Sequence, residues 1–214
     1  MTALPNVSTE TSPAGPKAES RPKMTYEEFL AWAGEDTHAE WVNGEVIEYM
    51  TAYTIHQRIV IFLIRLLQGF ADRGDVGEVF AAPMQVKLPR SGREPDVFFV
   101  KRENLDRVTE KYLDGPPDLI IEVVSDDSVS RDRVDKFEEY EEAGVREYWI
   151  IDPRPRRRRA DFYIHGADSK YQPVPLDTEG IYRSTVLPGF WLKASWLWEE
   201  PLPKLMPTLK EIAG

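Results

Sequence analysis

One run of residues restricts the folds open to this chain more than any other. The segment from Leu119 to Val124 is apolar at every position except Glu122, which is typical of a strand covered on both faces of a sheet. A carboxylate in such a strand is costly unless something pairs with it. We therefore expect Glu122 to contact a basic side chain, a set of hydrogen-bond donors or a metal ion.

A second run of similar character lies upstream and also carries one acid. Asp96 precedes the apolar segment 97–100. Side chains alternate between the two faces of a strand, so Glu122 shares a face with Ile120 and Val124. If the two strands are neighbours in register, Asp96 and Glu122 converge at one end of the sheet. With Lys136 in the following helical stretch, this pattern predicts metal-assisted phosphodiester chemistry.

Composition limits the alternatives. The 214 residues are enough for one domain with appendages, and the absence of cysteine excludes disulfides, zinc–thiolate sites and cysteine nucleophiles. No run of 18 apolar residues and no signal-peptide pattern occur, so we expect a cytoplasmic protein without a membrane span. The net charge of −10 argues against non-specific coating of nucleic acid. An acidic nuclease with a locally basic cleft remains compatible with it.

The pattern along the chain predicts a tail followed by one folded domain. Residues 1–23 are rich in Ser, Thr, Pro and Ala and are expected to be disordered, residues 24–200 form the domain, and 201–214 form a C-terminal extension. Thr25 and Glu28 make a capping box that begins a short helix. A hairpin follows around the turn Asn43-Gly44, and apolar spacing predicts a long helix over 55–70.

The second half predicts an α/β sheet with mixed strand directions. Strands are expected at 79–82, 84–88, 96–100, 119–124 and 147–151, the last with a hairpin partner at 160–164. A charged helix over 130–143 should end at Gly144 and face inward with Val134, Phe137 and Tyr140. Helices among strands in this order favour the α/β class.

Several motifs together resemble a known family. The matching segments are Glu94-Pro95-Asp96, Asp118 to Ser125, Arg131-Asp132-Arg133 with Lys136 and Tyr140, and Ala143 to Pro153. Over roughly residues 24–195 the chain is similar to the Uma2 family, whose members are restriction-endonuclease-like proteins of the PD-(D/E)XK nuclease superfamily. Val124 stands where the lysine of the superfamily motif would fall. The resemblance implies that in this family the lysine has moved to the following helix, where Lys136 matches it.

This resemblance implies a restriction-endonuclease-like mixed β-sheet flanked by helices, and an endonuclease that hydrolyses DNA with Mg²⁺ or Mn²⁺. It implies that Asp96 and Glu122 hold the metal and that Lys136 assists catalysis. The backbone carbonyl of Val123 and the carboxylate of Glu45 are further candidate ligands. The alternatives are a catalytically silent module for binding or assembly, and a hydrolase of RNA or small nucleotides.

Other residues carry a simpler explanation beside the functional one. Glu45 fits the surface of a hairpin as well as a metal site, and His56 fits a polar first turn better than a cleft. The run Arg156 to Arg159 is explained by a solubilising loop more simply than by contact with DNA. Trp191, Trp196 and Trp198 predict core packing or an oligomer contact, and we expect a homodimer.

Overall fold

The computed structural model describes residues 23–33, 39–48, 54–125 and 131–213. The predicted tail lies outside these ranges except for its last residue. Tyr49, with which the second strand of the predicted hairpin ends, and Ser130, with which the charged helix begins, also lie outside them. Within the described part of the chain, no helix is long and apolar enough to cross a membrane.

A six-stranded mixed sheet forms the centre of the fold. β8 and β9 pair in parallel, and the other neighbours are antiparallel. The α/β class with a mixed sheet is therefore confirmed. In spatial order the strands are β11 (Tyr171–Pro173), β10 (Arg159–His165), β9 (Glu147–Asp152), β8 (Leu119–Val123), β6 (Val97–Lys101) and β3 (Gly77–Ala81).

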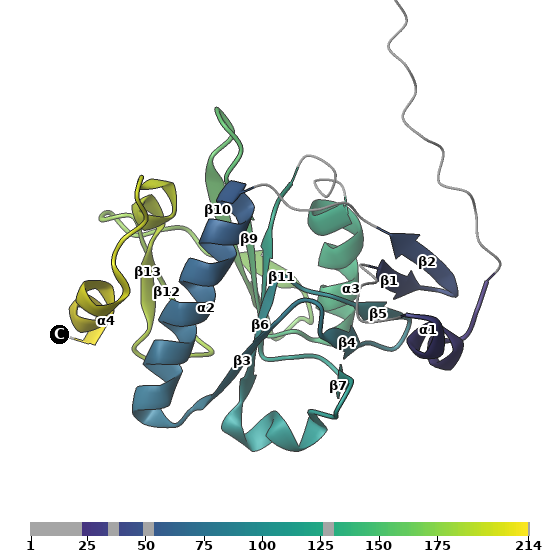
Figure 1. Ribbon diagram of the computed structural model, residues 1–214. Coiled ribbons are helices and arrows are strands. Elements are labelled where there is room, and N and C mark those ends of the chain that lie inside the picture. Colours follow the sequence, from purple (N-terminus) through teal and green to yellow (C-terminus); the bar gives the residue numbers. More distant parts are fainter. Residues whose placement is uncertain (1–22, 34–38, 49–53, 126–130, 214) are drawn as a thin grey trace, which may run out of the picture.

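Helices cover both faces of this sheet, as its apolar strands require. α2 (Thr54–Gly74) packs Leu63 and neighbouring residues on the face that carries Ile121. α3 (Lys136–Ala143) packs Tyr140 on the opposite face, against Ile120 and Val124. Figure 1 shows α2 and α3 on either side of the sheet. Glu122 therefore lies on the α3 face, as the alternation of side chains predicts.

A five-stranded sheet lies beside α3 and supplies further residues to the site. Its hairpin turns at Asn43 and Gly44, both at positive φ, as the sequence predicts. The capping box at Thr25 and Glu28 also forms, at the start of α1 (Tyr26–Trp32). In spatial order the strands are β2 (Glu45–Glu48), β1 (Ala39–Val42), β5 (Ser91–Arg93), β4 (Gln85–Lys87) and β7 (Tyr112–Asp114).

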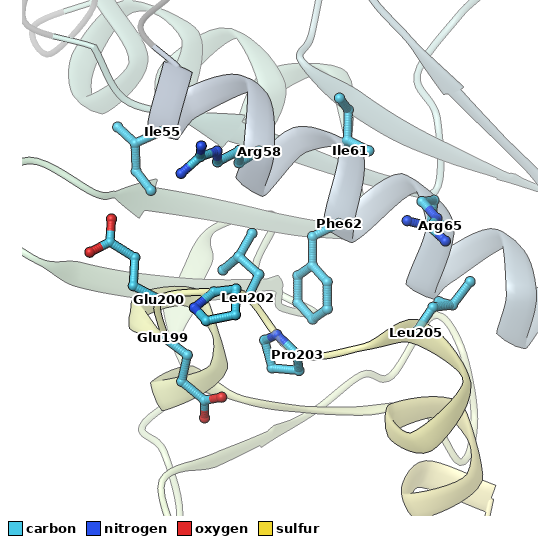
Figure 2. Close-up of a pocket in the computed structure, with 11 residues that line it drawn as sticks. Ile55, Arg58, Ile61, Phe62, Arg65, Glu199, Glu200, Leu202, Pro203 and Leu205 are labelled. Atoms are coloured by element: carbon cyan, nitrogen blue, oxygen red, sulfur yellow. The ribbon is translucent and has the colours of Figure 1, made fainter.

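The C-terminal part of the chain packs against α2. β12 (Ile181–Arg183) and β13 (Trp191–Lys193) form a separate two-stranded sheet, and Trp196 belongs to the core on this side. α4 (Leu205–Ala213) adds Leu209 and Ile212 to the same core. A pocket of about 340 Å³ remains between α2 and residues 199–205, with Phe62 and Pro203 facing each other across it (Figure 2). It is mainly apolar, and none of the predicted catalytic residues lines it.

Two details differ from the prediction. The helix over 130–143 is regular only from Lys136, because residues 131–135 form a π-helical turn, η2 (Arg131–Asp135). This change of register turns Val134 outward, where it is 50% exposed. In addition, residues 102–117, for which no helix or strand was predicted, contain β7 and the 3₁₀ helix η1 (Arg102–Arg107).

Candidate active site

Glu122 is paired by two donors from one helix. Its Oε1 accepts a hydrogen bond from Lys136 Nζ at 2.9 Å and another from the Tyr140 hydroxyl at 2.8 Å. Lys136 and Tyr140 are four residues apart on α3, so they lie on the same side of the helix. The side chains of Glu122 and Lys136 are 3% and 7% exposed. The carboxylate that the sequence places in an apolar strand is thus satisfied by the predicted lysine.

Asp96 lies at the end of the same sheet. Its Oδ2 accepts a hydrogen bond from the backbone N–H of Val123 at 2.7 Å and lies 3.2 Å from His56 Nε2. This carboxylate, at 21% exposed, is the more accessible of the two acids. Both contacts fall on Oδ2, and Oδ1 accepts no hydrogen bond from the described residues.

Pro95 explains why strand pairing stops here. β6 and β8 pair antiparallel with Val97 opposite Ile121. If this register continued for two more residues, Pro95 would face Val123. Proline has no N–H to donate to the Val123 carbonyl, while the Val123 N–H is taken by the Asp96 side chain. The N–H and C=O of one strand residue point the same way. The Val123 carbonyl is therefore directed toward the side of β8 on which Asp96 lies.

A second set of buried charges supports Lys136 from the five-stranded sheet. Glu40 Oε1 lies 3.1 Å from Lys136 Nζ, and Glu40 Oε2 accepts a hydrogen bond from Arg93 at 3.0 Å. Arg93 also forms a two-pronged contact with Glu139 of α3, at 2.9 and 2.7 Å. These pairs fix α3 against β1 and β5, because a forked guanidinium contact defines both position and angle.

The charges around Lys136 determine which groups stay protonated. Burial, together with the nearby carboxylates of Glu122 and Glu40, raises the pKa of the Tyr140 hydroxyl well above its usual value. Tyr140 therefore remains a neutral donor to Glu122. Burial alone would lower the pKa of Arg93, but hydrogen bonding to Glu139 and the charge of Glu40 raise it instead. Arg93 therefore stays cationic.

The donor set suits a hard divalent cation. Among the described residues, no group of three or more His, Asp or Glu side chains is arranged to hold a metal. Mg²⁺ commonly needs only one or two carboxylates, completed by water and substrate phosphate. One buried network joins Glu40, Glu122 and Glu139 with Arg93 and Lys136. Asp96 lies beside it at the Val123 N–H, and the formal charges of these six side chains sum to −2 when His56 is neutral.

The structure joins Lys136 to Glu122 and joins Asp96 to the backbone of Val123, the residue after Glu122, but it brings Glu45 to neither contact. The Glu45 carboxylate lies on the outer hairpin strand, is 64% exposed and is 3.4 Å from Lys23 Nζ. Glu40, on the opposite strand of that hairpin, supplies the acid in its place. The hairpin surface is therefore the better account of Glu45.

Sequence reasoning missed three residues of this group. His56 was assigned to a polar first turn, although it is buried and reaches Asp96. Glu40 and Arg93 were not singled out at all. Glu40 precedes the predicted turn at Asn43-Gly44 and could have been noted as an acid beside the apolar Trp41 and Val42. Arg93 lies in a short strand whose sequence, Ser-Gly-Arg, carries no strand signal.

Comparison with known proteins identifies the family of this chain. The sequence profile of the Uma2 family, described as “Putative restriction endonuclease”, matches residues 26–195. The chain belongs to the Uma2 family. All the residues gathered here, from Glu40 to Lys136 and Tyr140, lie within the matched range.

A solved structure has the same fold. The crystal structure of “a putative nuclease belonging to DUF820” from Anabaena variabilis ATCC 29413 superposes with a TM-score of 0.66 and 15% sequence identity. The match covers 82% of this Uma2 chain and 97% of the other. No curated protein matches the chain.

Proposed function

We propose that this Uma2 protein is a metal-dependent endonuclease that hydrolyses phosphodiester bonds of DNA. The observation that carries the proposal is a pair of contacts made by adjacent residues at one end of β8. The carboxylate of Asp96 binds the N–H of Val123, the residue after Glu122, and the ammonium of Lys136 lies 2.9 Å from Glu122. Membership of a family described as restriction endonucleases supports the same conclusion.

The carboxylates of Asp96 and Glu122, with the carbonyl of Val123, are the oxygen donors for Mg²⁺ or Mn²⁺. All three come from β8 or from the residue that precedes β6. A divalent cation bound there supplies a Lewis acid and an activated water. Asp96, the more accessible acid, lies on the side from which substrate approaches.

Lys136 orients the attacking water or stabilises the negative charge that develops on the phosphate. Glu122 and Glu40 hold its ammonium group from two sides, at 2.9 and 3.1 Å. Tyr140 fixes Glu122 through the same oxygen atom that Lys136 contacts. The protein therefore positions both the Glu122 carboxylate and the Lys136 ammonium before substrate arrives. Electrostatic preorganisation lowers a reaction barrier in this way.

A plasmid-nicking assay tests the proposal. Supercoiled plasmid should be nicked by the wild type with Mn²⁺ or Mg²⁺, and nicking should stop with excess EDTA. Asp96→Asn and Glu122→Gln, purified in parallel, should lose activity by roughly 10²-fold or more. Glu45→Gln, an exposed acid on the outer hairpin strand, should match the wild type.

One observation favours a second function, that of a catalytically silent binding or assembly module. Lys136 is buried in ion pairs with Glu122 and Glu40, and such pairs can be purely structural. The same assay decides between the two. Nicking that persists equally in Asp96→Asn and Glu122→Gln would contradict catalysis at this site, and absence of nicking from the wild type with either metal supports the silent module.

A further inference from the structure

The turn between β9 and β10 concentrates positive charge in an acidic chain. Five of the six residues from Arg154 to Arg159 are arginines, whereas the whole chain carries a net charge of −10. The arginines divide into two sets with different surroundings.

The arginines at the base of the turn are neutralised. Arg154 forms a forked contact with Asp152, at 2.8 and 2.7 Å, and Arg159 lies 2.5 Å from Asp161. Arg133, from the π-helical turn η2, also reaches Asp161 at 2.8 Å. The base is thus a network of alternating charges that fixes the turn on the sheet.

The arginines at the tip are not neutralised. Arg156, Arg157 and Arg158 are exposed, and none forms an ion pair with a described residue. Arg156 has a positive φ of 65°, and the Arg157 N–H closes the turn on the Arg154 carbonyl at 3.0 Å. Three uncompensated cations are therefore displayed on a short, backbone-closed turn.

The tip lies at the same end of the sheet as the candidate active site. β9 runs parallel to β8, with Glu122 opposite Ile150 and the Val124 N–H bound to the Ile151 carbonyl. The chain enters the turn directly after Asp152, just beyond this pair. Figure 1 shows the β9–β10 turn projecting past the end of the sheet at which α2, the helix of His56, begins.

We propose that Arg156, Arg157 and Arg158 bind the phosphodiester backbone of DNA and hold it over the carboxylates at the end of β8. The proposal rests on the proposed function and goes beyond it by naming a contact surface. A site with excess negative charge repels a polyanion, so binding needs cations nearby that are not already paired. The planar guanidinium is suited to phosphate because it can donate two parallel hydrogen bonds.

The test is a salt titration of DNA binding by the full-length chain. Anisotropy of a labelled duplex is measured with Ca²⁺ in place of Mg²⁺, for the wild type and for the triple variant Arg156→Asn, Arg157→Gln, Arg158→Gln. Asparagine is chosen at 156 because it tolerates positive φ. Each phosphate contact contributes about 0.9 to the slope of log K against log salt, so the slope should fall by about 2.7.

A matched control removes the same charge elsewhere. Lys111→Gln, Lys204→Gln and Lys210→Gln together alter three exposed lysines, none of them in an ion pair with a described residue. This triple should keep the wild-type slope, and Arg157→Gln alone should lower it by about 0.9. Melting temperatures close to wild type would show that all variants are folded.

The outcomes distinguish the proposed contact surface for DNA from the proposed nuclease activity. If the wild type nicks plasmid and the tip triple binds with unchanged slope, the surface is overturned while the proposed function stands. An equal fall in slope in both triple variants would reflect net charge alone and would also overturn the proposed contact surface. A wild type that neither nicks nor binds duplex overturns both proposals.

Discussion

Lys136 contacts two buried carboxylates. Replacing Lys136 should therefore destabilise the protein more than replacing Glu122. Replacing Glu122 with glutamine leaves Lys136 in contact with Glu40 at 3.1 Å, a carboxylate that Arg93 also contacts. Without metal, Glu122→Gln should change the free energy of unfolding by no more than about 1 kcal/mol, since removal of one carboxylate also relieves repulsion. Lys136→Met leaves Glu122 buried without a cation, whereas Glu40 keeps Arg93 at 3.0 Å, and should cost about 3–5 kcal/mol.

Urea denaturation in EDTA measures this asymmetry. Equal destabilisation by the two variants would mean that the Lys136–Glu122 pair alone matters and that Glu40 contributes nothing. Because Lys136→Met is expected to be less stable, the kinetic role of Lys136 is better tested with Lys136→Arg. That variant keeps the positive charge but should restore turnover poorly, since a planar fork is not a compact ammonium.

Tyr140 gives the site a pH signature. Its hydroxyl donates to Glu122 at 2.8 Å, and its pKa is raised by burial and by the charges of Glu122 and Glu40. Tyr140→Phe should cost about 1.5–3 kcal/mol at pH 8, the value of a hydrogen bond to a charged group. The folded state holds this proton more tightly than the unfolded state. The advantage is therefore complete below the ordinary tyrosine pKa, near 10, and lessens as pH rises above it.

The comparison is made between the wild type and Tyr140→Phe at pH 8 and near pH 11. The difference in unfolding free energy should be smaller at the higher pH. A difference that is constant or grows would show that the hydroxyl contributes through packing rather than through its proton.

At the scale of elements, α4 is a test of how far the cooperative domain extends. Leu209 is buried and contacts α2 at Gly69, whereas Met206 of the same helix is 72% exposed. Leu209→Ala should cost about 2–5 kcal/mol, and Met206→Ala should stay within about 0.5 kcal/mol. Thermal or urea unfolding measures both. If Leu209→Ala is also nearly neutral, α4 is an appendage that unfolds independently.

The elements with a strong local signal were predictable. α2 has a long apolar stripe, the hairpin has Asn43-Gly44, and β8 is apolar at every position except Glu122. The strands β5 and β7 were not, because three residues such as Ser91-Gly92-Arg93 carry no periodicity and depend on pairing with distant segments. The outward turn of Val134 was missed because a π-helical turn shifts the 3.6-residue period.

The same distinction applies to the site. Asp96, Glu122 and Lys136 lie beside apolar runs or on the following helix, so strand alternation could place two of them together. Glu40, His56 and Arg93 reach the site only through the folding of a second sheet and the start of α2. Their roles depend on tertiary contacts far apart in sequence, which a local pattern cannot encode.

At the scale of the whole molecule, a net charge of −10 must be reconciled with a polyanionic substrate. The site itself carries excess negative charge, which a bound divalent cation would offset. Uncompensated arginines at the β9–β10 turn would offset more of it on the approach to the site. Metal binding is therefore the step on which the whole account depends.

Calorimetric titration of Mn²⁺ into the wild type, Asp96→Asn and Glu122→Gln tests that step most directly. We predict one site in the wild type, at least tenfold weaker binding in each variant, and wild-type binding in Glu45→Gln. Binding that is unchanged in both Asp96→Asn and Glu122→Gln would contradict the account, because the two carboxylates would then not form a metal site.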